Sequence, residues 1–171
     1  MGYKNGADIL SQYVDSTQRH QDTLVYPILF LYRHYLELMI KEILTDCAKI
    51  LDEKITFKHH NLSAYWEEAK DKCFKALEEK IPEDMIVPIE NMVRQLVEVD
   101  KSSDAFRYPC RKDGSATLEG MTHINIKRVS EEIAKTSDAL EAISAALSVA
   151  VETKADHEAN MRQLYGCSHH N

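Results

Sequence analysis

The fold is decided by LVYPILFLYRHYLELMIKEILTDCAKIL, residues 24–51. This stretch contains no glycine, and its one proline, Pro27, lies near the beginning, where the first turn of a helix tolerates it. At roughly 100° per residue, apolar side chains cover most of the circumference. The broadest apolar face consists of Ile28, Tyr32, Tyr35, Leu36, Met39 and Ile43. The pattern predicts a long helix, buried on most sides, at the centre of a helical bundle.

A narrow polar stripe interrupts the apolar surface of this helix. It contains Arg33, His34, Glu37 and Lys41, which fall within about a quarter-turn of one another. A cation, an imidazole and a carboxylate on one helical face can bind phosphate and move a proton. The same spacing also fits an Arg–Glu pair on a solvated face that contributes only slightly to stability. Both interpretations stay open at this point.

The rest of the chain is also helical in pattern. Shorter helices are predicted at 8–16, about 64–79 and 88–99, and a long one from about 126 past 151, as far as about 165. The prediction is an all-α, up-and-down bundle of four to five helices with one ordered loop insert at about 100–122. With 171 residues, the chain is expected to form a single domain over 1–165. Residues 166–171 are expected to be a disordered tail.

Composition limits the partners of the protein. There are 21 Lys and Arg residues against 28 Asp and Glu residues, so the net charge is −7 and the pI is about 5.6. A protein that coats nucleic acid nonspecifically carries the opposite charge, so this class is excluded. Any contact with RNA must therefore come from a local basic patch or from a cleft between two copies of the chain.

Several absences from the sequence narrow the chemistry. The four cysteines form no C-x-x-C pair, and the N-terminus lacks the features of a signal peptide, so a reducing cytoplasm is expected. The longest apolar run, 24–32, is too short to span a bilayer, so no membrane partner is expected. The sequence contains no phosphate-binding glycine loop, and it has no Glu-x-x-His motif that could complete a metal site together with His34 and Glu37. Neither a metal nor another cofactor is predicted.

Two further polar segments are candidates for a site. The segment 100–109 carries Asp104, Arg107 and Tyr108, and Arg107 can hold a phosphate through two hydrogen bonds. It can equally pair with Asp104 in a purely structural loop. The second segment is His59-His60-Asn61, before the helix predicted at 64–79, where Asn61 or Ser63 can cap the helix. A histidine there can act as a base, or it can simply bond to the backbone or to solvent.

Three motifs together suggest a family. They are Leu31-Tyr32-Arg33-His34-Tyr35-Leu36-Glu37-Leu38 with Lys41, then His60-Asn61-Leu62, then Phe106-Arg107-Tyr108-Pro109. In this order, over roughly residues 22–150, the chain resembles the HEPN superfamily of prokaryotic α-helical domains. The resemblance implies a helical bundle that pairs through a two-fold interface. Many members of the superfamily are metal-independent ribonucleases in toxin–antitoxin, abortive-infection and CRISPR-linked defence, and others have lost catalysis and serve as binding modules.

The resemblance also implies roles for individual residues. The expected catalytic residues are Arg107, His34, His60 and Glu37. The expected substrate-binding residues are Arg33, Lys41, Asn61, Asp104 and Tyr108. The chain departs from the nuclease members in one respect, because their signature is an Arg followed by a His after four to six residues. Only Arg162 and His169 satisfy this spacing, and they lie at the end of the chain.

Two functions follow as alternatives. The first is a protein that binds or cleaves RNA in a defence or toxin-type system. The second is a catalytically inactive interaction module, of phage or mobile-element origin, that binds a protein partner. A homodimer is expected for either, because 24–51 is apolar almost all round and 142–146 is rich in small residues. The apolar surface of these two segments together is larger than one small bundle easily buries.

Overall fold

The computed structural model describes residues 2–100, 106, 114 and 124–166. These residues form five helices and, within the same ranges, no strand. The helices are α1 (Gly2–Thr17), α2 (Gln21–Ile50), α3 (Leu62–Leu77), α4 (Glu83–Val99) and α5 (Ile126–Gly166). The predicted all-α helical bundle is confirmed.

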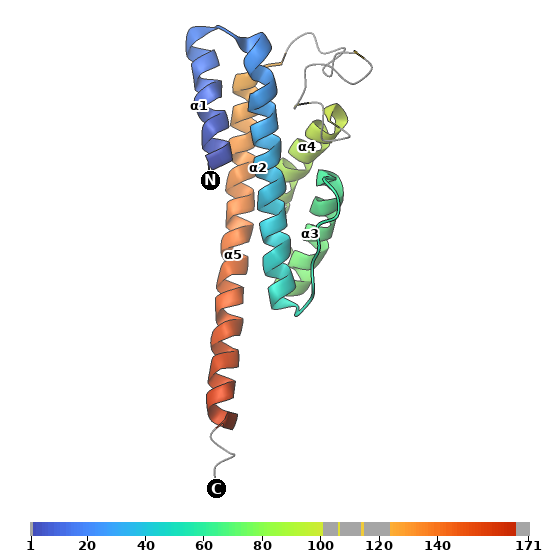
Figure 1. Ribbon diagram of the computed structural model, residues 1–171. Helices are drawn as coiled ribbons and strands as arrows, with labels where there is room; N and C mark the ends of the chain where they lie inside the picture. Colours follow the sequence, from blue (N-terminus) through green and yellow to red (C-terminus); the bar gives the residue numbers. More distant parts are fainter. Residues whose placement is uncertain (1, 101–105, 107–113, 115–123, 167–171) are drawn as a thin grey trace.

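Helix α2 lies at the centre and packs against α1, α3 and α5, while α4 packs against α3 and α5 (Figure 1). Its contacts with α5 show that these two helices run in the same direction. The hydroxyl of Tyr32, in the first half of α2, lies 3.0 Å from that of Ser130. At the other end of α2, Lys154 of α5 donates to the carbonyl of Ile50 at 2.8 Å.

Helices α2 and α3 also run in the same direction. His60, just before α3, contacts Glu37, whereas Cys73 near the end of α3 contacts Cys47. The connection 51–61 therefore returns along the bundle before α3 begins (Figure 1). This connection departs from the strict alternation of an up-and-down bundle. It places the end of the connection beside the middle of α2.

Three helices begin earlier than the pattern predicts. Helix α1 starts at Gly2 rather than at residue 8, and α2 starts at Gln21, so Pro27 lies inside the helix rather than in its first turn. Helix α4 starts at Glu83 and continues through Pro88. The acidic first turn of α4 favours this earlier start, because carboxylates there interact well with the positive end of the helix dipole. Each proline removes one backbone donor from its helix, and its ring crowds the carbonyl four residues earlier.

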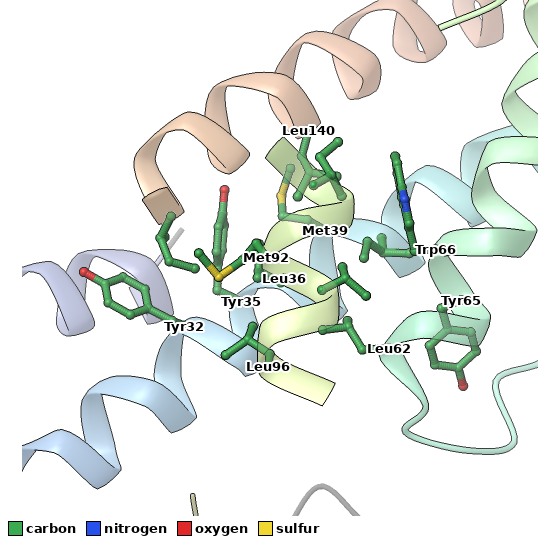
Figure 2. Close-up of a cluster of buried hydrophobic side chains, with 14 of the residues drawn as sticks. Tyr32, Tyr35, Leu36, Met39, Leu62, Tyr65, Trp66, Met92, Leu96 and Leu140 are labelled. Atoms are coloured by element: carbon green, nitrogen blue, oxygen red, sulfur yellow. The ribbon is translucent and has the colours of Figure 1, made fainter. Parts of the chain in front are cut away.

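The core is formed where α2 meets the other helices (Figure 2). Apolar side chains of α2, α3, α4 and α5 fill it. Its most deeply buried large side chains include Trp66, Tyr32, Tyr35, Leu36, Leu62 and Leu140. Burial of such side chains contributes roughly 1.5–3 kcal/mol each to stability.

The covering of α2 bears on the expected homodimer. Many of its apolar side chains are buried within the chain, where α2 packs against α1, α3 and α5, whereas Leu38 is 36% exposed. The first argument for a homodimer is therefore weaker than the sequence pattern implies. The second argument stays, since Ala142, Ala145 and Ala146 are exposed. The homodimer itself remains a prediction.

Helix α5 is much longer than the bundle and extends well beyond it (Figure 1). Near the end of α2, Lys154 of α5 donates through Nζ to the carbonyls of Lys49 and Ile50 at 3.0 and 2.8 Å. The same ammonium lies 2.6 Å from the carboxylate of Asp52. From residue 155 to 164, every side chain is exposed except the half-buried Glu158.

The remaining predictions on organisation fall mostly outside the described residues. Of the ordered loop insert expected at about 100–122, only Asp100, Phe106 and Gly114 are described. Residues 167–171 of the expected tail also lie outside, whereas Gly166 belongs to α5. In the described part of the chain, no helix is both long and apolar enough to cross a membrane.

Candidate functional site

A buried carboxylate on α2 is the centre of the candidate site. The side chain of Glu37 is only 3% exposed, yet it contacts three basic side chains. Its Oε1 lies 2.6 Å from Nζ of Lys41 and 2.8 Å from Nδ1 of His60. Its Oε2 accepts a hydrogen bond from Nη1 of Arg33 at 3.3 Å. Arg33, Glu37 and Lys41 share one face of α2 because they are four residues apart.

These contacts keep Glu37 ionised. Burial by itself would raise the pKa of its carboxyl group, because a low-dielectric environment disfavours the charged form. The hydrogen bonds from Lys41 and His60, and the charges of these two groups, act in the opposite direction and prevail. The pKa of Glu37 therefore lies below its usual value, and the group is a carboxylate at neutral pH.

Arg33 joins three segments of the chain. Its side chain is 7% exposed. Its Nη2 donates to the backbone carbonyl of His60 at 2.9 Å. Its Nε lies 3.2 Å from Oδ2 of Asp100, the residue that follows α4 and whose side chain is 1% exposed. A guanidinium with several donors suits this position, because one side chain can bind α2, the connection before α3 and the end of α4 together.

His60 is the part of this group that reaches the solvent. Its side chain is 62% exposed, whereas that of its partner Glu37 is 3% exposed. An imidazole whose Nδ1 is held by a carboxylate has a fixed orientation, and proton exchange then falls to Nε2. This is the arrangement of an oriented acid–base group.

The backbone around His60 is held by local contacts. The ring of His59 stacks on that of Tyr65 with 4.4 Å between centroids, and the Tyr65 hydroxyl donates to the carbonyl of His59. Asn61 is the N-cap of α3, and its side chain accepts a hydrogen bond from the amide of Ala64 at 3.1 Å. Such a cap contributes about 1 kcal/mol to stability. His60 is thus presented by a fixed helix start.

Aromatic rings and cations lie beside His60. Nζ of Lys41 lies 5.3 Å from the ring centroid of Phe57 and 5.1 Å from that of Tyr65, within the range of a cation–π contact. Phe57 is 38% exposed. The side chains of Lys54 and Lys58 are exposed as well. The segment 54–60 therefore forms a local basic and aromatic surface on a protein whose net charge is −7.

His34 belongs to a different part of the molecule. Its ring meets that of Tyr3 on α1 edge-on, with 4.5 Å between centroids, and stacks on that of Phe30 at 5.9 Å. The polar stripe predicted for α2 thus divides between two neighbours. Arg33, Glu37 and Lys41 face the start of α3, while His34 packs beside α1. Helical periodicity placed all four residues within a quarter-turn but could not indicate which helix covers each edge of the stripe.

Of the other predicted site residues, one lies beside the cluster and three fall outside the described part of the chain. Asn61 lies beside the cluster as a helix cap, as its type and position predicted. Asp104, Arg107 and Tyr108 lie outside the described residues. Asp100, Phe57 and Tyr65 also lie at this site, although none of them was among the predicted site residues. Tyr65 lies at an apolar position in the repeat of its helix. The sequence therefore does not distinguish it from a residue of the hydrophobic core.

No metal centre accompanies the cluster in the part of the chain described. Among those residues, no group of three or more His, Cys, Asp or Glu side chains is arranged to hold a metal ion. A hollow of about 580 Å³ lies between α4 and α5 and is lined by Met92, Leu96, Phe106 and Arg128 among others. Its described lining includes none of the predicted site residues. The cluster around Glu37 therefore stays the candidate site.

Comparisons with known proteins return no match. No family model, no curated protein and no solved structure matches this chain.

Proposed function

We propose that this protein binds single-stranded RNA beside His60 and cleaves it by acid–base chemistry, with His60 as the proton carrier. The observation that carries the proposal is the pairing of an exposed imidazole with a buried carboxylate, 2.8 Å apart at Nδ1 of His60 and Oε1 of Glu37. A positioned histidine accelerates proton transfer by about 10²–10⁴-fold. The three motifs that resemble HEPN proteins include both residues.

The proposed reaction uses protein side chains, the RNA and water. His60 takes the proton of a ribose 2′-hydroxyl, and the 2′-oxygen attacks the adjacent phosphorus. The bond from phosphorus to the 5′-oxygen breaks, this oxygen takes a proton from water, and His60 returns its proton to the solvent. The products are a 2′,3′-cyclic phosphate and a free 5′-hydroxyl. Arg107 stays the expected clamp for the charge that builds on the phosphate.

Binding is proposed to rest on the surface 54–60 together with Lys41. The exposed ring of Phe57 can stack a base, and such stacking contributes about 1–3 kcal/mol per base. Lys41, Lys54 and Lys58 supply positive charge for the phosphates, which a protein of net charge −7 must concentrate locally. Arg33 is nearly buried within the network, so in this proposal it positions His60 rather than touching RNA.

The biological setting follows only from the resemblance. A HEPN-like ribonuclease of this size is proposed to act in the cytoplasm, in a defence or toxin-type system, and as a homodimer.

Cleavage of mixed cellular RNA in EDTA tests the proposal. The wild-type protein is expected to cut the RNA, and His60→Gln is expected to lose at least about 100-fold of the rate. The matched control is His157→Gln, an exposed histidine on α5 far along the helix from the site, which is expected to keep the wild-type rate. Arg107→Ala is measured beside them. The proposal fails if His60→Gln is folded and cuts as fast as the wild type.

The alternative function is a non-catalytic module that binds a protein partner. It is favoured by the engagement of Arg33 inside the network, with Glu37, Asp100 and the carbonyl of His60 as partners. This alternative predicts uncut RNA with every variant and no RNA binding that weakens steeply with salt. Phosphate contacts would produce that salt dependence because they release counterions.

A further inference from the structure

Two cysteines meet at the other end of the interface between α2 and α3. The sulfur of Cys47 on α2 lies 3.6 Å from that of Cys73 on α3, and both residues are completely buried. Both are free thiols. A disulfide has a sulfur–sulfur bond of about 2.05 Å, so the two sulfurs are in contact and about 1.5 Å from bonding distance.

The surroundings make the two thiols unequal. The hydrogen bond from Cys73 and, to a smaller extent, the charge of Lys72 favour the thiolate form of Cys47. The pKa of Cys47 is lowered although burial and the charge of Asp46 act in the opposite direction. The pKa of Cys73 is raised, by its hydrogen bond to Cys47 and by burial. Because the thiolate is the nucleophile, Cys47 is the cysteine expected to react with an oxidant.

The pair lies beneath a single helix. Cys73 is on the inner face of α3, whose outer face carries the exposed Phe74 and Lys75. Lys72, beside Cys73, reaches out to Glu53 at the surface. Because both sulfurs are buried, access for a small oxidant such as a peroxide requires α3 to move outward.

We propose that Cys47 and Cys73 are a modification site, at which a hydroperoxide forms an intramolecular disulfide that joins α2 to α3. The Cys47 thiolate attacks one peroxide oxygen, the O–O bond breaks, and hydroxide leaves. The resulting sulfenic acid is attacked by the sulfur of Cys73, whose proton leaves with the displaced hydroxyl group as water. In total, two thiols are oxidised, one hydrogen peroxide is reduced, and two water molecules form.

The bond would fix the two helices that carry the candidate site. Glu37 and Lys41 lie on α2, and His60 precedes α3, so a covalent link between Cys47 and Cys73 restrains their separation. The site itself uses neither sulfur. The inference therefore does not depend on the proposed RNA cleavage, and the two can fail separately.

The test is hydrogen peroxide treatment of the folded chain, followed by alkylation of free thiols, digestion with trypsin and mass spectrometry. Cys110→Ser and Cys167→Ser are introduced to remove the other two cysteines. The expected product is peptide 42–49 linked to peptide 73–75, with two hydrogens lost. Cys47→Ala and Cys73→Ala, each in the same background, must abolish the linked product. Protein oxidised while unfolded in urea shows that the linked peptide can be detected.

The thermal midpoint gives a second readout. The oxidised protein is expected to melt about 5–10 °C above the reduced protein, because the bond closes a loop within the unfolded chain. Treatment with a thiol reductant must reverse the shift. The proposal is wrong if both cysteines stay open to alkylation after prolonged peroxide treatment of the folded protein, or if Cys47 passes to the sulfinic acid without linking to Cys73.

Discussion

Helix α2 carries two polar networks on different faces, and they differ in what they connect. Toward α1 and α5, the hydroxyl of Tyr32 lies 2.7 Å from the carboxylate of Asp8, and that of Tyr35 lies 2.6 Å from the hydroxyl of Ser137. Toward α3, Glu37 binds charged partners and reaches the surface through His60. Both networks hold α2 to its neighbours.

The difference lies in charge and access. Burial raises the pKa of both Tyr32 and Tyr35, so their phenols stay neutral within the interface. The hydroxyls of Tyr32 and Tyr35 bond to side chains of α1 and α5, among them the carboxylates of Asp8 and Glu141, and these bonds stabilise a single arrangement of the helices. The Glu37 network keeps a carboxylate charged and ends in an imidazole that is 62% exposed. One helix thus uses one network for packing and the other for a candidate site.

The largest expected effect comes from removing the carboxylate. Glu37→Ala leaves Arg33 and Lys41 without their shared partner, and breaking a buried ion pair costs about 3–5 kcal/mol. Urea unfolding measures the loss. Glu37→Gln, which keeps the shape of the side chain, is expected to lose less stability but to release His60 and slow RNA cleavage. A loss below about 1 kcal/mol for Glu37→Ala would show that the network is not a structural unit.

A smaller effect is expected in the hydroxyl network. Tyr35→Phe removes one buried hydrogen bond and is expected to lower the free energy of unfolding by about 1 kcal/mol. RNA cleavage should not change, because this network contains neither His60 nor Glu37. Tyr13→Phe, on the exposed side of α1, is the control and should leave stability unaltered. A change in cleavage with Tyr35→Phe would contradict the division between the two networks.

The helix cap tests how His60 is presented. Asn61→Ala is expected to cost about 1 kcal/mol, whereas Asn61→Asp should retain the cap, because a carboxylate also accepts from the amide of Ala64. Circular dichroism with thermal unfolding measures both. If His60 depends on this helix start, Asn61→Ala should also slow cleavage and Asn61→Asp should not.

The smallest effect is expected from pH. The pKa of Glu37 is lowered in the folded protein, so its contribution to stability is complete above the pKa of the unfolded chain. That contribution is lost as the pH falls through the folded pKa, below the usual carboxyl range. The difference in unfolding free energy between wild type and Glu37→Gln should therefore shrink as the pH falls below about 5. A difference that grows in that acidic range would contradict the direction of the shift.

Much of the architecture could be predicted from the sequence, because the spacing of apolar residues along a helix indicates which face of the helix is buried. The long apolar pattern of α2 and the capping position of Asn61 are local properties. The direction of α3 is not local, since the connection 51–61 has no period that reveals its return along the bundle. The pairing of Glu37 with His60 depends on that return. The partner of His34 and the role of Asp100 depend likewise on contacts between distant segments.

The contact of Lys154 with the last turn of α2 divides α5 into two parts with different tolerance to change. Before this lysine, the helix contributes buried side chains such as Leu140 and Leu147 to the core. A substitution of these residues is therefore expected to disturb the packing of the core. After it, residues 155–164 lie almost entirely in solvent. That part can be shortened, labelled or fused to another domain without disturbing the bundle. A protease is expected to cut first in the same place, which makes Lys154 the practical boundary of the folded unit.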